Sequence, residues 1–124
     1  IESRSMIDIA SKHIIPAVIK YITALATSIN QVRQASGDVT VEVQEELLAK
    51  ASELLTETRN ALKKLEEVTA QVENVQPIRD KAFFFREHIV PAMEALRKPV
   101  DELEMIVDKN MWPMPSYGDL LFEV

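Results

Sequence analysis

Two histidines are the side chains of this chain whose chemistry best suits proton transfer or zinc binding. They lie in near-identical segments, His13-Ile-Ile-Pro-Ala17 and His88-Ile-Val-Pro-Ala92. A zinc site needs three or four ligands at short spacing, and each histidine stands without such companions in sequence. We therefore interpret His13 and His88 as half-buried packing or hydrogen-bonding residues, and their prolines as two helix kinks. A paired-histidine metal site is the weaker alternative.

Three carboxylates, Asp101, Glu104 and Asp108, share one predicted helix face, a geometry that could hold a hard cation. Carboxylates on an outer helix face are more often solvated, and we favour that interpretation. The chain has two glycines, too few for a glycine-rich phosphate loop, and it contains no Glu-x-x-His motif of the di-iron bundles. The sequence therefore predicts no catalytic residue, no cofactor-binding residue and no metal ligand.

Length and composition narrow the class of protein. The 124 residues fit one domain, predicted to be a fragment of a longer polypeptide because the chain begins at Ile1 with no signal peptide. The absence of cysteine suits a reducing compartment, and a cytoplasmic location is expected. The net charge of −6 argues against nucleic acid. Residues 14–32 approach the length of a membrane span, but polar residues interrupt them and favour a buried helix of a soluble protein.

The hydrophobic periodicity predicts an all-α fold, an antiparallel up-down-up bundle of three long helices followed by a non-helical C-terminal strap. The helices are expected over residues 3–35, 41–74 and 77–107, and Pro99 either kinks or breaks the third. At the corners we expect a left-handed cap at Gly37, an N-cap at Asp38 or Thr40, and Pro77 as a first helical residue. The predicted core stripe of the second helix includes Ala61, and that of the third includes Ile78, Ala82, Phe85 and Ile89.

Apolar side chains exceed what one core-facing stripe can hold. Phe83, Phe84 and Phe85 together span about 200° of a helix, so Phe83 or Phe84 must point away from the bundle. Residues 111–124 form a predicted docking tail, in which Pro113 and Pro115 end the third helix. The apolar residues of this tail would be costly to leave in water, and we expect them to dock: Trp112, Tyr117, Leu120, Leu121 and Phe122.

The tail also carries a family resemblance. The run from Trp112 to Phe122 and the preceding Arg97–Glu104 resemble the carboxyl end of the large, type III bacterial glutamine synthetases, and residues 14–21 and 25–30 are similar to the helical C-terminal region of that family. The resemblance implies a parent enzyme that joins glutamate and ammonia with ATP and Mg or Mn, in glutamine biosynthesis and nitrogen metabolism. The catalytic motifs of the family are absent from these residues, so the resemblance assigns no catalytic position here.

Two functions follow as hypotheses. The first is a noncatalytic C-terminal domain that packs on the catalytic domain of the same chain and on neighbouring subunits of a large homo-oligomer, with no nucleic-acid or membrane partner. The alternative is a freestanding helical-bundle module for protein–protein interaction that uses Phe83, Phe84 and the tail. Whether the tail docks on its own bundle or on another subunit stays open at this point.

Overall fold

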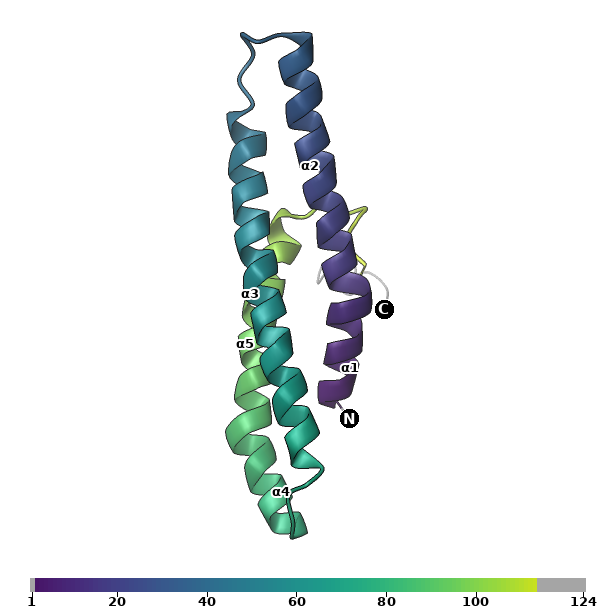
Figure 1. The fold of residues 1–124 in the computed structure, drawn as a ribbon, viewed down its shortest axis with the longest axis vertical. Helices are drawn as coiled ribbons and strands as arrows, with labels where there is room; N and C mark the ends of the chain where they lie inside the picture. The colour runs from purple at the N-terminus through teal and green to yellow at the C-terminus, as the bar shows by residue number, and fades with distance from the viewer. Residues whose placement is uncertain (1, 114–124) are drawn as a thin grey trace, which may run out of the picture.

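The structure is a computed structural model that describes residues 2–113, and every regular element in that range is helical. The first long helix comprises α1 (Glu2–Ile9), a π-helical turn (Ala10–Ile14) and α2 (Ile15–Ala35). The second is α3 (Glu42–Val72). The third comprises α4 (Ile78–Phe84), a second π-helical turn (Phe85–Ile89) and α5 (Val90–Ile106). Figure 1 shows the three running up, down and up, which confirms the predicted all-α bundle.

The second helix holds the bundle together, because α3 packs against α1 and α2 on one side and against α5 on the other. The core divides into two clusters of buried side chains. The upper cluster consists of Ile14, Val18, Tyr21, Leu25, Ala51, Leu54, Leu103 and Val107. The lower cluster consists of Ala10, Leu62, Leu65, Val68, Ile89, Ala92 and Leu96. Each fully buried aliphatic side chain stabilises the fold by about 1.5–3 kcal/mol.

The corner between α2 and α3 differs from the predicted one. Gly37 does not adopt a positive φ, so the predicted left-handed cap is wrong. The chain leaves α2 through Ser36 in an extended conformation instead, and the Ser36 hydroxyl accepts a hydrogen bond from the Asp38 N–H. Thr40 accepts one from the Glu42 N–H at 3.2 Å, which gives α3 a polar partner at its start although Val41 occupies the N-cap position itself.

The third helix begins at Ile78 rather than at Pro77, whose carbonyl oxygen accepts the Asp80 N–H at 2.9 Å. Pro99 lies inside α5 and is buried, so one helix passes through this proline. The helix ends at Ile106, well before Pro113, and the prediction that the tail prolines end it is wrong. The chain leaves α5 through Val107 in an extended conformation, and the Asp108 carboxylate then accepts the Asn110 N–H at 2.8 Å.

Two of the predicted core stripes need correction. On the third helix, Ile78 is 84% exposed and Ala82 is also exposed, because α4 makes few contacts with the other helices and buries only the face that carries Phe84. On α3, Leu62 is fully buried whereas Ala61 is only partly so. Thr58, which interrupts the stripe in sequence, is buried with its hydroxyl donating to the Leu54 carbonyl at 2.8 Å.

The first long helix is less covered than expected. Residues Glu2–Ala35 are long and apolar enough, by length and composition alone, to cross a membrane, a test that a core helix of a soluble protein also passes. Only 28% of its most apolar window is buried inside the structure. The prediction of a buried helix therefore holds for one face, and Ile19 on another face is 49% exposed.

Candidate interaction surface

The repeated histidine segments form the two π-helical turns. The Ile15 N–H donates to the Ala10 carbonyl and the Val90 N–H donates to the Phe85 carbonyl, each immediately before a proline. In an ordinary helix the proline ring would clash with the carbonyl four residues earlier, and a wider turn makes room for it. The sequence predicted two kinks, and the structure places a π turn at each position.

Both histidine side chains are exposed, so the prediction of half-buried histidines is wrong. The π turns direct the following isoleucines inward instead, because Ile14 is 5% exposed and Ile89 is 0% exposed. His88 stacks on Phe84 with ring centroids 4.6 Å apart. This contact is an aromatic packing interaction on the bundle surface.

The carboxylates are also spread over the surface. Within residues 2–113 the structure contains no group of three histidine, aspartate or glutamate side chains that could hold a metal ion, and Asp101 and Asp108 are both exposed. Asp108 instead acts on the ionisation of a neighbouring tyrosine. Burial raises the pKa of the Tyr21 phenol, and the negative charge of Asp108 raises it further.

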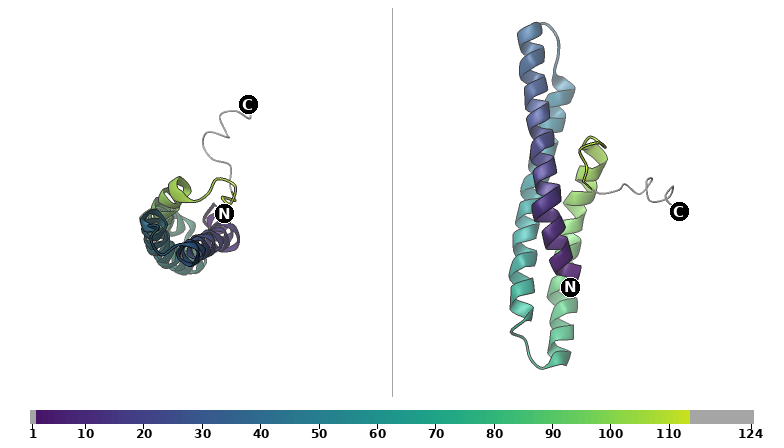
Figure 2. Two further views of the ribbon diagram at one scale, coloured as in Figure 1. Left: turned by 90° about the horizontal axis from the view of Figure 1, so that it is seen from above. Right: turned by 90° about the vertical axis from the view of Figure 1, so that its right-hand side faces the viewer.

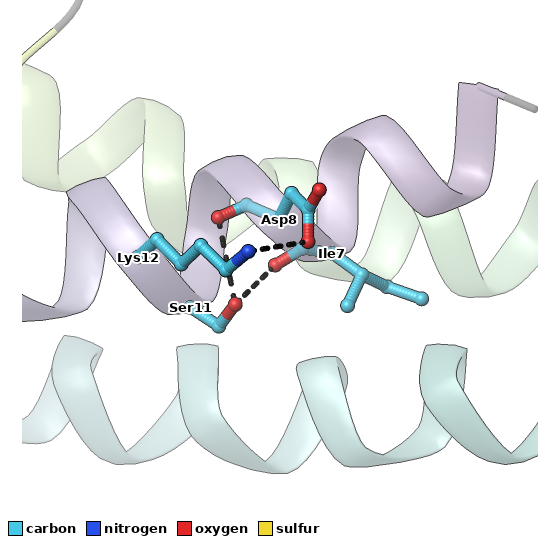
Figure 3. A network of polar contacts seen from close by, with 4 residues as sticks. All are labelled: Ile7, Asp8, Ser11 and Lys12. Carbon is cyan, nitrogen blue, oxygen red and sulfur yellow. Dashed lines mark hydrogen bonds and ion pairs between the residues drawn. The ribbon is translucent and has the colours of Figure 1, made fainter.

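A small polar network borders the first π turn (Figure 3). The Ser11 hydroxyl donates to the Ile7 carbonyl at 2.7 Å, and the Lys12 ammonium lies 3.6 Å from the Asp8 carboxylate. Both Lys12 and Asp8 are exposed, and an exposed ion pair contributes little to stability. The network serves the local helix geometry, because the Ser11 hydroxyl supplies a further donor to the Ile7 carbonyl beside the turn.

Exposed apolar side chains are the clearest functional feature of the described residues. Phe83, which the sequence singled out, is 56% exposed, whereas Phe84 is partly buried against the lower cluster. The sequence analysis placed Ile78, at the start of the same helix, in the core, and did not find it as an exposed residue. Its exposure depends on where the neighbouring helices end, which the sequence of this helix does not show. The other large exposed apolar residues are Ile19, Val39, Val43, Val90, Met105 and Met111.

The predicted docking tail is described only at its beginning. Trp112 is partly buried and packs against the upper cluster. Pro113 and Met111 lie beside His13 and Pro16 of the first helix. The remaining predicted docking residues, Tyr117, Leu120, Leu121 and Phe122, lie outside the described residues.

Comparisons with known proteins agree with the predicted resemblance. Residues 1–33 match the model of the glutamine synthetase C-terminal domain. Over 98% of this chain, the sequence is 29% identical to a glutamine synthetase of Bacteroides fragilis and 27% identical to a type-3 glutamine synthetase of Dictyostelium discoideum. It is 25% identical to a glutamine synthetase of Butyrivibrio fibrisolvens over its full length.

The chain spans 17–18% of the length of these relatives. The family model and the relatives agree, because each of them is a glutamine synthetase or its C-terminal domain. The relatives align with nearly the whole chain, including the described bundle. Together they confirm the predicted resemblance: this chain is similar to the C-terminal domain of the glutamine synthetases.

Proposed function

We propose that this bundle is a noncatalytic C-terminal domain of an ATP-dependent glutamate–ammonia ligase, which packs on the catalytic domain of the same polypeptide and on neighbouring subunits. The relation to proteins named glutamine synthetase supports the ligase part of the proposal. The small share of those proteins that the chain spans leaves room for a catalytic domain elsewhere in the polypeptide.

The observation that carries the packing role is the apolar surface at the start of the third helix. Ile78 is 84% exposed and Phe83 is 56% exposed, and both lie on the short helix α4. The two side chains lie five residues apart, about 140° around the helix axis, so α4 offers apolar contacts in two directions. Large exposed apolar surfaces mark interaction sites on soluble proteins. Buried aromatic and aliphatic anchors also supply most of the binding energy of protein interfaces.

The chemistry belongs, in this proposal, to the rest of the polypeptide. ATP and Mg or Mn would bind to the catalytic domain, and we assign no catalytic, nucleotide-binding or metal-binding role to any position of this chain. The expected setting is the cytoplasm, in a large homo-oligomer that makes glutamine for nitrogen metabolism.

The direct test of the noncatalytic role uses the purified chain 1–124. We expect it to form no glutamine from glutamate, ammonia and ATP, and to give no ATP-binding signal in isothermal titration calorimetry. The matched control is the full-length polypeptide under the same conditions, which should do both. Turnover by the isolated chain would overturn the proposal.

A freestanding interaction module is the second candidate, because the same exposed Ile78 and Phe83 could serve a separate partner protein. The coding sequence upstream of Ile1 separates the two. Several hundred upstream codons that encode a ligase domain would support the ligase proposal. A start codon directly before Ile1 would support the freestanding module.

A further inference from the structure

The two corners of the bundle lie at opposite ends of the molecule (Figures 1 and 2). One joins α2 to α3 and the other joins α3 to α4, so the 31 residues of α3 hold them roughly 46 Å apart. Val39 and Val43 are 53% and 67% exposed at the α2–α3 corner, and Ile78 is 84% exposed at the α3–α4 corner. Each corner therefore presents apolar side chains that the described part of the chain leaves open.

The α3–α4 corner is hollowed into an open depression of about 630 Å³. Ile78 and Pro77 give the depression an apolar floor, and Arg79 and Lys81 give it positive charge. The remaining lining residue is the uncharged Gln76, so the described residues that line the depression include no carboxylate. The depression therefore suits a ligand that is both apolar and acidic.

The carboxylates near this corner do not cancel its positive charge. Asp80 follows Ile78 by two residues, about 200° around the helix axis, and so faces away from it. Glu73 at the end of α3 is paired with Arg4 of the first helix. Residues 76–87 as a whole contain three basic and two acidic side chains, a net charge of +1 in a chain whose net charge is −6.

The α2–α3 corner carries the opposite charge. Residues 33–46 contain four carboxylates and a single basic side chain, a net charge of −3. That basic side chain, Arg33, is paired with Glu45 at 2.9 Å. The other three carboxylates are exposed around Val39 and Val43, and they belong to Asp38, Glu42 and Glu46.

Charge complementarity selects the partner. A contact between the same corner of two copies would bring like charges together, which disfavours it. A contact between the α2–α3 corner of one copy and the depression of another brings opposite charges together and buries apolar side chains of both. A single chain cannot make this contact within itself, because α3 holds its two corners apart. The partner that fits is therefore a second copy of this chain.

We propose that the α2–α3 corner of one copy binds in the depression at the α3–α4 corner of a second copy. Val39 and Val43 contact Ile78 there, and the carboxylates lie beside Arg79 and Lys81. This rests on the proposed packing role and deepens it, because it names the surface of the neighbouring subunit that covers Ile78. A contact between two different surfaces leaves one of each free at the ends, so it either closes into a ring or continues as an open chain.

The test is a disulfide between two single-cysteine variants of the full chain, which itself contains no cysteine. G37C places a thiol at the acidic corner, where Gly37 has no positive φ and an added Cβ meets no described atom within 4 Å. A82C places a thiol on α4 four residues after Ile78, on the same face. A disulfide forms readily only when the two Cα atoms approach within about 7 Å.

One variant is labelled with heavy nitrogen, the two are mixed in equal amounts and oxidised mildly, and intact mass identifies each disulfide-linked dimer. We expect the heterodimer of G37C and A82C to exceed the share that random pairing gives. A heterodimer at the random share, or an excess of either homodimer, would overturn the proposal.

Further variants separate the apolar contact from the charges. I78S added to the A82C chain should return the heterodimer to the random share. The matched control M105S should not, because Met105 is 86% exposed near the end of α5 and lies at neither corner. Equal effects of I78S and M105S would contradict the contact.

The charges are tested by reversal. R79E/K81E in the A82C chain should lower the heterodimer share, and E42K/E46K in the G37C chain should do the same. The mixture that carries both reversals should recover the share, because the opposite charges then face each other again. A mixture with both reversals that stays at the random share would count against the proposal.

The full-length polypeptide separates failure of this contact from failure of the packing role. V39S/V43S should reduce its assembly in sedimentation velocity, as removal of Ile78 and Phe83 should. If V39S/V43S assembles as the parent does while the variant lacking Ile78 and Phe83 does not, the packing role stands and the end-to-end contact is wrong.

Discussion

The backbone N–H of Ile15 donates to the carbonyl oxygen of Ala10, five residues earlier in the chain. Pro16 follows directly, and the third helix repeats the arrangement with Val90, Phe85 and Pro91. A proline inside a regular α-helix costs about 3 kcal/mol or more through its ring clash and its missing donor. The wide turn relieves that clash, and both pentapeptides adopt this same π-helical conformation.

Substitution of Pro16 tests this relief. If the π turn removes the clash, Pro16→Ala gains nothing in the folded state and makes the unfolded chain more flexible. The free energy of unfolding should then fall by about 0.4–1 kcal/mol. Urea unfolding followed by circular dichroism measures this value, and Pro91→Ala should behave in the same way. Stabilisation by about 3 kcal/mol would show that the ring was strained after all.

Leu62 tests the corrected register of α3. It is fully buried in the lower cluster, so Leu62→Ala should lower the free energy of unfolding by about 2–5 kcal/mol through lost burial and a cavity. The neighbouring Lys63 is exposed, and Lys63→Ala should stay within about 0.5 kcal/mol of the parent. Equal effects of the two substitutions in chemical denaturation would contradict the register.

Tyr21 predicts a pH dependence at the alkaline end. Its pKa is raised in the folded state by burial and by Asp108, so the folded protein holds the phenol proton more tightly than the unfolded chain. The stability from this group is complete below pH of about 10, the ordinary tyrosine pKa, and is lost as the pH rises through the higher folded value. The difference in unfolding free energy between the parent and Tyr21→Phe should therefore change as the pH rises above about 10, with the parent losing more. Parallel curves for the two proteins would refute the assignment.

The regular part of the fold was predictable because its signals are local. Apolar residues at three- and four-residue spacing fixed the three helices, and the observed α3, Glu42–Val72, begins and ends within about two residues of the predicted one. The same spacing found Ile89 and Leu103 as core residues, and each is buried in a cluster that includes side chains of α3.

The errors arose where the outcome depends on a neighbouring element. Ile78 continues the apolar spacing of the third helix, yet it is exposed because α4 makes few contacts with the other helices. Gly37 is permissive for a left-handed cap, but the exit of the chain through extended Ser36 makes that conformation unnecessary. His13 and His88 face outward because the π turns shift the register by which the adjacent isoleucines are buried.

The candidate interaction surface was partly predictable, because one of its signals is local to a single helix. Three consecutive phenylalanines cannot all face one core, which predicted that Phe83 or Phe84 points away from the bundle, and Phe83 is the exposed one. Periodicity gives no sign of the apolar groove that Met6, Ile9, Leu96 and Val100 line between the first helix and α5, because spacing along one helix does not reveal which neighbour covers it. Their open side depends on how far α5 lies from the first helix.

We infer that this domain serves packing and assembly rather than catalysis, and sedimentation velocity of the full-length polypeptide tests this role most directly. The double variant Ile78→Ser/Phe83→Ser removes the exposed apolar anchors, and Lys63→Ser is the matched surface control. We expect the double variant to sediment as smaller species, while glutamine formation per assembled subunit and the sedimentation of the control stay at the parental values. A double variant that sediments as the full assembly but has lost glutamine formation would contradict the account.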